Sequence, residues 1–392
     1  MEEEFAALAD PRFYTQALKE LKSAFPTAKL KRIAQDSANS IIFLSCEDCG
    51  YKHGAAYMFS YVYEIFPVFT FVKDIDAEYY TVIENVLDLI SVLGAKSFRI
   101  EVKKIDYKSK ERAKDLEVKM GREIESRGPV ADLKNPKLLI NVVLTSSGAI
   151  IGSQDVPKIV GLDAFRYFNK LDAEHINRSE FKLIEAIEHF GVEIKKGERC
   201  IDVGSAPGGW THFLLSNGAK VLAIDSALMD YDAMPPQSSI LIVMQDPSKS
   251  KPFLKAENRK IELKSVKEFE EYAKKSNPFN YYDLVHVASN ITSTSLLSLD
   301  GLGKFGILAI DINRGPEEAA AVAASLCTLL DPGARIIMTI KMPESKPEHY
   351  VEEARRALSG LTTEVKFAKL RHNRQELTAF AIFNASRGEP NL

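Results

Sequence analysis

The chain has 392 residues, of which 45% are hydrophobic and 27% are charged, and its formal net charge is −3. This length suffices for two or three domains, and the composition is that of a soluble globular protein. No stretch approaches the roughly 20 consecutive apolar residues that a membrane-spanning helix needs. The acidic start, MEEEFAALADP, does not resemble a secretory signal, so we expect a cytoplasmic protein. The small net charge argues against uniform coating of nucleic acid, although a local basic surface is compatible with it.

The four cysteines, Cys46, Cys49, Cys200 and Cys327, are too few and too scattered for a disulfide framework. Cys46 and Cys49 form a CxxC pair with His53 nearby, which could be half of a zinc site. Because no second CxxC follows, we expect incidental thiols at a hairpin tip and no metal.

The first 155 residues predict two small domains of mixed helix and strand, at 1–94 and 95–155, followed by an irregular linker at 156–175. Between Lys96 and Lys137, Lys and Arg outnumber Asp and Glu, so a basic surface is expected there. The expected elements are a helix at 13–25, a strand at 40–46, an apolar run from residue 57, a helix at 77–93, a strand at 97–105, a basic helix at 110–126 and strands at 138–144 and 148–152.

After residue 176 strands and helices alternate, which is typical of an α/β domain with a mainly parallel sheet, here expected at 176–386. Residues 228–279 interrupt this pattern and are expected to be an insertion. The expected helix lies at 179–192, and the expected strands lie at 199–204, 220–225, 306–311, 335–340, 363–370 and 377–383.

The third strand of this sheet has two candidates. The insertion contains SILIVMQD, which ends at Asp246, and DLVHVASN follows it and ends at Asn290. The second lies closer to the next strand and fits a single βαβ step better. We therefore favour Asn290, with Asp246 as the alternative.

A glycine-rich loop directly follows the strand that starts at Arg199. Its sequence is not GxGxxG and it contains a proline, so it differs from a dinucleotide loop. About twenty residues later a strand ends in Asp225, a position suited to gripping ribose hydroxyls. S-adenosylmethionine has no pyrophosphate to bind, so it suits this loop better than NAD. The expected cofactor-binding residues are Asp202, Gly204, Ser205, Ala206, Pro207, Gly208, Gly209, Trp210, Asp225, Asn290 and Asp311.

Four ionisable residues are candidates for catalysis. Asp311 and Lys341 end neighbouring parallel strands, at the edge of the sheet where ligands bind. Lys182 lies on the helix before the glycine loop, and Glu376 precedes the last strand. Abstraction of a proton from a ribose hydroxyl by lysine needs a lowered pKa, which burial or a second cation provides. We expect Lys182 to lower the pKa of Lys341, with the two carboxylates orienting the amines.

At these residues the chain resembles the FtsJ-like ribose 2′-O-methyltransferases, which carry a Lys-Asp-Lys-Glu tetrad. The matching segments are NRSEFKLIEA, DVGSAPGGWT, IDINRGP, TIKMP and HNRQELT. Their order and context are most similar to the RlmM branch, which methylates a cytidine ribose in large-subunit (23S) ribosomal RNA. The resemblance implies a Rossmann-like class I S-adenosylmethionine methyltransferase domain with Lys341 as the base, acting on RNA, with ribosomal RNA as the expected substrate.

The N-terminal part resembles a ferredoxin-like domain followed by a THUMP RNA-binding domain, through FRIEVKKID, AKDLEVKMGREI and VADLKNPKLLINVVL. This resemblance implies RNA contacts by Lys103, Lys104, Lys108, Lys110 and Arg112, although such a charge run could equally be a solvated helix face.

Two alternatives remain open. One is an RNA base N-methyltransferase of the THUMP type, although Asp311-Ile-Asn-Arg differs from the Asn/Asp-Pro-Pro-aromatic motif of those enzymes. A 5-methylcytosine enzyme would need a cysteine near a strand end, whereas Cys327 falls in a helical run. The other is a non-catalytic RNA-binding or ribosome assembly factor, which the four intact tetrad positions argue against.

Overall fold

The structure, a computed structural model, describes residues 2–47, 59–73, 79–133, 136–155, 176–177, 179–244, 261–289, 301–342 and 348–386. The chain divides into two compact units, residues 1–170 and 171–392. No helix in the described ranges is long and apolar enough to cross a membrane.

The N-terminal unit contains one eight-stranded sheet in the order β2-β3-β1-β4-β8-β7-β5-β6. The strands are β1 (Glu2–Ala9), β2 (Lys29–Gln35), β3 (Ser40–Glu47), β4 (Val62–Val72), β5 (Ser97–Lys104), β6 (Val130–Ala131), β7 (Leu138–Thr145) and β8 (Gly148–Asp155). The helices are α1 (Tyr14–Ala24), α2 (Tyr79–Val92) and α3 (Ala113–Glu125).

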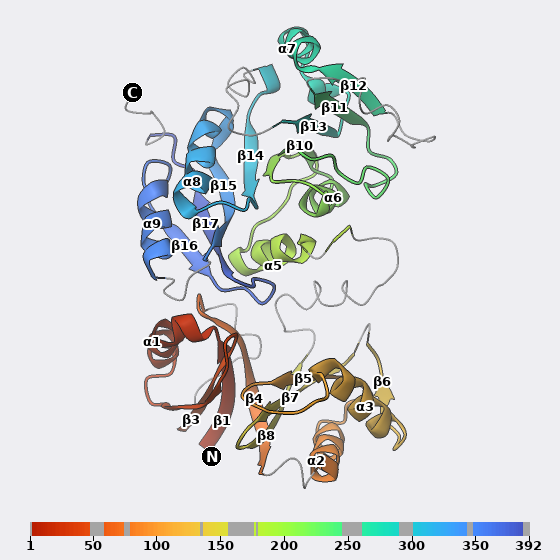
Figure 1. The fold of residues 1–392 in the computed structure, drawn as a ribbon, viewed down its shortest axis with the longest axis vertical. Coiled ribbons are helices and arrows are strands. Elements are labelled where there is room, and N and C mark those ends of the chain that lie inside the picture. Colours follow the sequence, from red (N-terminus) through yellow and green to blue (C-terminus); the bar gives the residue numbers. More distant parts are fainter. Residues whose placement is uncertain are drawn as a thin grey trace. The chain divides into compact units, whose positions relative to one another are not determined.

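The long strand β4 joins what the sequence predicted as two separate domains. One part of β4 pairs antiparallel with β1, and the part from Val68 to Val72 pairs antiparallel with β8. Figure 1 shows β4 between β1 and β8. Helix α2 packs its Val82, Ile83 and Val86 against strands of the second half, so the division expected at residue 94 falls before α2.

The C-terminal unit contains a nine-stranded sheet in the order β12-β11-β13-β10-β9-β14-β15-β17-β16 (Figure 1). The strands are β9 (Arg199–Val203), β10 (Lys220–Asp225), β11 (Ile240–Met244), β12 (Ile261–Ser265), β13 (Leu284–Ala288), β14 (Phe305–Ile310), β15 (Leu330–Lys341), β16 (Val365–Ala368) and β17 (Glu376–Ile382). The helices are α5 (Glu180–Phe190), α6 (Gly209–Ser216), α7 (Val266–Lys275), α8 (Pro316–Ser325) and α9 (Glu348–Leu358).

All strand pairs from β12 to β15 are parallel, whereas β17 runs antiparallel to β15 and β16. The expected mainly parallel α/β domain is therefore confirmed. Helices α5 and α6 pack against the sheet through Leu183, Trp210 and Leu214, which share a core with Ile307 and Ala309 of β14. This packing brings the start of α5 to the carboxyl ends of the central strands.

The predicted insertion widens the sheet. Within it, β11 and β12 continue the parallel order beyond β13, and α7 packs beside them. The strand next to β10 is β13, with Asp225 opposite Ala288. The strand order thus agrees with the choice of DLVHVASN as the third strand, while Asn290 and Asp246 lie outside the described residues.

Candidate functional site

The strand register gathers three of the four predicted catalytic residues at one edge of the C-terminal sheet. Lys341, the last residue of β15, lies directly opposite Glu376, the first residue of β17. Asp311 follows β14, and its backbone N–H donates to Val203 O of the neighbouring β9 at 2.9 Å. The fourth, Lys182, reaches this edge from the first turn of α5.

The four side chains form a closed ring of alternating charge. Lys182 Nζ lies 2.8 Å from both Glu376 oxygens and 3.3 Å from Asp311 Oδ2. Lys341 Nζ lies 2.9 Å from Asp311 Oδ1 and 3.2 Å from Glu376 Oε2. The side chains are 10% to 23% exposed, with Lys341 the most accessible. The ring is therefore largely buried but open to solvent at Lys341, where a substrate can approach.

The ring changes two pKa values. Burial alone would raise the pKa of Asp311, but Lys182 and Lys341 outweigh it and lower that pKa. Burial alone would lower the pKa of Lys341, but Asp311 and Glu376 outweigh it and raise that pKa. The expectation that Lys182 lowers the pKa of Lys341 is therefore wrong for this structure, because two carboxylates contact the Lys341 ammonium directly.

Thr339 is a member of the site that the sequence interpretation missed. Its hydroxyl donates to Asp311 Oδ1 at 2.7 Å, and the residue is 1% exposed. Thr339 precedes Lys341 by two positions in β15, so both side chains lie on the same face of the strand. This two-residue spacing was the available signal, and the bond fixes the carboxylate plane of Asp311.

The glycine-rich loop lies beside the ring, between β9 and α6. Gly204 has φ +79°, and a Cβ there would lie 2.4 Å from Asp311 O, so the loop and the ring are in direct contact. Gly208 has φ +120°, and a Cβ would lie 2.4 Å from Met234 Cε. The positive φ disfavours a side chain at both positions, and at Gly204 a side chain would also collide with the backbone of Asp311.

The loop is held to the end of β10 by Asp225. One Asp225 oxygen accepts from Ala206 N at 3.0 Å and the other from Ala227 N at 2.9 Å. Behind the loop, Thr211 Oγ1 donates to Asp202 Oδ2 at 2.6 Å. Within the described residues, Asp202 Oδ1 and Ser205 Oγ are buried without a hydrogen-bond partner. These atoms and the close backbone approach fit a small polar ligand such as S-adenosylmethionine.

The indole of Trp210 faces the protein core. Trp210 is 3% exposed, and its Nε1 donates to Ser179 O at 2.7 Å. Its side chain therefore ties α6 to the start of α5, and any cofactor contact at this position would involve the backbone.

The predicted RNA-binding residues of the N-terminal unit divide into two groups. Lys103 lies 3.0 Å from both Glu64 and Glu101, and its side chain is only 20% exposed. Lys104 Nζ donates to the carbonyls of Ser109 and Glu111, which closes a turn. The ammonium groups of Lys103 and Lys104 therefore already bond to other groups of the N-terminal unit.

The other three basic residues, Lys108, Lys110 and Arg112, are exposed. Arg112 is bonded to Asp115 at 2.8 Å, through both its Nε and its Nη2. The turn at Lys108 and Lys110 is therefore the part of the predicted surface with the most accessible positive charge.

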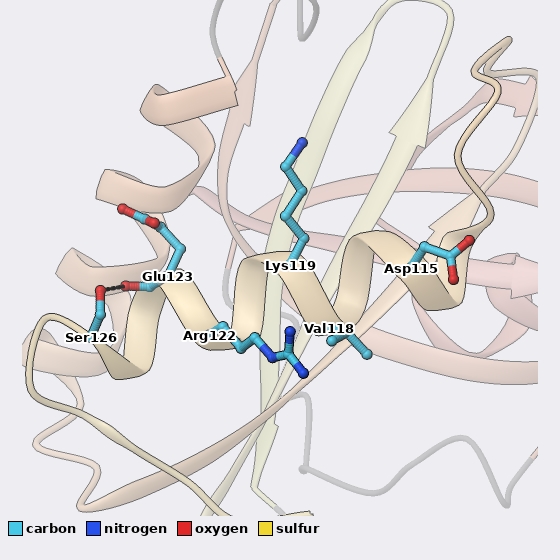
Figure 2. Close-up of a pocket in the computed structure, with 6 residues that line it drawn as sticks. All are labelled: Asp115, Val118, Lys119, Arg122, Glu123 and Ser126. Atoms are coloured by element: carbon cyan, nitrogen blue, oxygen red, sulfur yellow. Dashed lines mark hydrogen bonds between the residues drawn. The ribbon is translucent and has the colours of Figure 1, made fainter.

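A shallow hollow in the N-terminal unit is lined by residues of α3 and by Ser126, which follows this helix (Figure 2). Its lining contains two cationic side chains and two carboxylates, so the hollow has no net positive or negative charge. Its lining residues are Asp115, Val118, Lys119, Arg122, Glu123 and Ser126.

The described residues contain no group of three or more His, Cys, Asp or Glu that could hold a metal. Cys46 is buried in β3 and is disulfide-bonded, so the expected incidental thiol is wrong at this residue and its sulfur is not available to a zinc ion. Cys49 and His53, the other candidate zinc ligands, lie outside the described residues. Cys327 is 8% exposed in a turn before β15, at the opposite end of that strand from Lys341, and burial raises the pKa of its thiol. It is thus not placed as a nucleophile.

Comparisons with known proteins point to RNA methyltransferases. Residues 175–294 match the family described as FtsJ-like methyltransferase. "Ribosomal RNA large subunit methyltransferase M" of Shewanella pealeana is 29% identical over 161 residues, 37% of this chain and 43% of that protein. "Ribosomal RNA large subunit methyltransferase E" of Acidiphilium cryptum is 47% identical over 73 residues, 18% of this chain and 31% of that protein. The chain thus matches less than half the length of either relative.

Among solved structures, TrmN from Thermus thermophilus is similar over 97% of this chain and 99% of that one, with 13% identity. Its TM-score of 0.35 is too low to support an inference about function.

The family match covers Lys182, the glycine-rich loop and Asp225, and it ends before Asp311. The similarity to the methyltransferases M and E supports the same assignment. Residues 175–294 are therefore similar to the FtsJ-like methyltransferase family.

Proposed function

We propose that this chain is an S-adenosylmethionine-dependent RNA methyltransferase that modifies a ribose 2′-hydroxyl, with large-subunit ribosomal RNA as its substrate. The observation that carries the proposal is the ring of Lys182, Asp311, Lys341 and Glu376 in contact with the glycine-rich loop. The names of the similar proteins point to ribosomal RNA.

The residues of the ring have distinct roles in this proposal. S-adenosylmethionine, when bound by the loop and Asp225, supplies a methyl group already activated by the positive charge on sulfur. Lys341 Nζ accepts the proton of the 2′-hydroxyl and must therefore be neutral beforehand. Lys182, bonded to both Glu376 oxygens, keeps that carboxylate in place. Asp311, fixed by Thr339, orients Lys341 from the other side.

A base-methylating enzyme fits the site less well. Four charged side chains surround the reaction edge, and the sequence after Asp311 is Ile-Asn-Arg rather than a Pro-Pro-aromatic segment. The buried Cys327 at the other end of β15 argues against a cysteine nucleophile.

The product of the reaction tests the proposal directly. The full chain is incubated with radiolabelled S-adenosylmethionine and with purified ribosomal RNA or ribosomal particles, and the RNA is digested to nucleosides. We expect label in a 2′-O-methylnucleoside, cytidine first of all. Label in a base would support the base methyltransferase instead, and no label in any substrate would support a non-catalytic RNA-binding factor.

We infer that the turn bearing Lys108 and Lys110 binds RNA phosphates. Replacing both residues by Ala is expected to weaken RNA binding and to lower the salt-dependence slope by about 1.4, since each phosphate contact on a single strand contributes about 0.7. Affinity for S-adenosylmethionine should not change. Filter binding over a salt series measures both effects on RNA.

The matched control replaces two other exposed lysines, Lys29 and Lys31 of β2, by Ala and so removes the same charge. Equal weakening by the two double variants would mean that net charge, and not this turn, determines RNA binding.

A further inference from the structure

The turn that carries Glu376 into the ring is unusually buried. It connects β16 to β17 and contains Lys369, His372 and Asn373, which are 5%, 8% and 6% exposed. Connecting turns are ordinarily exposed and mobile, because their backbone groups need water as a partner. Here the partners are protein groups, and the turn is fixed from two sides.

The first side is Glu185 of α5, which is 6% exposed. One of its oxygens accepts from Arg371 N at 2.7 Å. The other accepts from His372 N and His372 Nδ1, each at 2.9 Å. Burial alone would raise the pKa of Glu185, but the bonds from His372 outweigh it and lower that pKa. Glu185 thus holds the turn as a carboxylate.

The second side is Lys369, whose ammonium lies inside the turn. Its Nζ donates to Asn373 O at 3.0 Å and to Glu376 O at 3.4 Å, and it also bonds Arg374 O. A buried ammonium is stable only where such acceptors surround it. The backbone carbonyl of Glu376 is therefore attached to the same cation that shapes the turn.

These contacts link two members of the ring through one helix. Glu185 follows Lys182 by three positions in α5, so both side chains lie on the same helical face. Lys182 bonds the Glu376 carboxylate while Glu185 bonds the turn just before it. A small displacement of the turn would therefore separate the Glu376 carboxylate from Lys182 and from Lys341.

We propose that Glu185 and Lys369 are positioning residues, which set the place of Glu376 in the ring by clamping the turn before β17. The inference rests on the proposed function, because its kinetic consequence requires that the ring performs methyl transfer. Misplacement of a reacting group by about 1 Å costs on the order of 100-fold in rate. Loss of the clamp should therefore lower kcat while leaving cofactor binding intact.

The test uses Glu185→Gln in the full chain, with the exposed Glu188→Gln on the same helix as the control. Hydrogen exchange is measured first, and the Arg371 and His372 amides should exchange faster in Glu185→Gln alone. Methyl transfer should then fall roughly 10- to 100-fold in kcat, with an unchanged KM for S-adenosylmethionine. The rate against pH should also move to lower pH, because a displaced Glu376 no longer stabilises the charged form of Lys341.

Unchanged exchange at the two amides would overturn the clamp, whether or not the chain methylates RNA. Faster exchange with unchanged kcat and an unchanged pH profile would overturn its positioning role. A wild-type chain that methylates no RNA would instead contradict the proposed function, while the exchange experiment would still decide on the clamp.

If Glu185→Gln does not fold, His372→Phe replaces it in the kinetic test. This variant loses the bond from His372 Nδ1 to Glu185 but keeps both backbone bonds to Glu185. It also keeps an aromatic ring beside Phe181, whose ring centroid lies 5.6 Å from that of His372. A few-fold loss of kcat with the same shift of the pH profile is expected, and unchanged kinetics would overturn the proposal.

Discussion

Lys341→Met is expected to lower the rate of methyl transfer by roughly 100- to 10,000-fold, the range in which a general base contributes. Lys341 has the most accessible side chain of the ring, and its Nζ is held by Asp311 and Glu376. The glycine-rich loop and Asp225 do not depend on it, so S-adenosylmethionine should bind with nearly wild-type affinity. Single-turnover transfer and calorimetry measure the two quantities separately.

The control is Lys366→Met, which removes an exposed lysine from β16 of the same unit. It should leave transfer unchanged. Undiminished transfer in Lys341→Met would remove this residue from the mechanism, and lost cofactor binding would assign it to the binding site instead.

The wild-type rate against pH provides a further check on Lys341. Its pKa is raised by Asp311 and Glu376, against the effect of burial, so the amine stays protonated over the neutral range. At pH values below that pKa, the fraction of neutral Lys341 increases about tenfold with each rise of one pH unit. The rate should therefore rise steadily with pH from about 7 to 9, and a flat profile would contradict a base that must first lose its proton.

The sequence predicted that Asp311 and Lys341 lie close together, because strand ends determine their positions. Asp311 and Lys341 each follow an apolar strand, and parallel strands end at the same edge, so their proximity followed from pattern alone. The direction of the pKa shift at Lys341 did not follow. That direction depends on whether a carboxylate or the Lys182 ammonium lies nearer to Lys341 Nζ. The order of residues in the sequence does not determine these side-chain distances.

The N-terminal unit was predicted less completely, for reasons of composition and long-range pairing. Strand β1, Glu2–Ala9, is rich in Ala and Glu, which favour helices, and it forms a strand because β3 and β4 pair with both of its edges. The joining of two expected domains into one sheet depends on register between β4 and β8. Local periodicity contains no information about such distant pairing.

Asp202→Asn is expected to change how stability depends on pH. Burial, with smaller contributions from Asp311 and Asp225, raises the pKa of Asp202 to about 7 from 3.8. In the folded chain the carboxyl thus stays protonated up to about pH 7, whereas in the unfolded chain it ionises near 3.8. Its contribution is fully present below pH 3.8 and is lost as pH rises through about 7, a difference of roughly 4 kcal/mol.

An asparagine at position 202 cannot ionise, and its amide oxygen can still accept from Thr211 Oγ1, which lies 2.6 Å from Asp202 Oδ2 in the native chain. Any packing cost of Asp202→Asn is therefore the same at every pH. Relative to wild type, the variant should gain unfolding free energy as pH rises from about 4 to 8, measured by urea unfolding of the C-terminal unit in the full chain. Asp331→Asn, at an exposed position of β15, should show no such trend. A constant difference between Asp202→Asn and wild type across this range would mean that Asp202 ionises normally in the folded chain, and that water or a charged partner reaches the base of the cofactor loop.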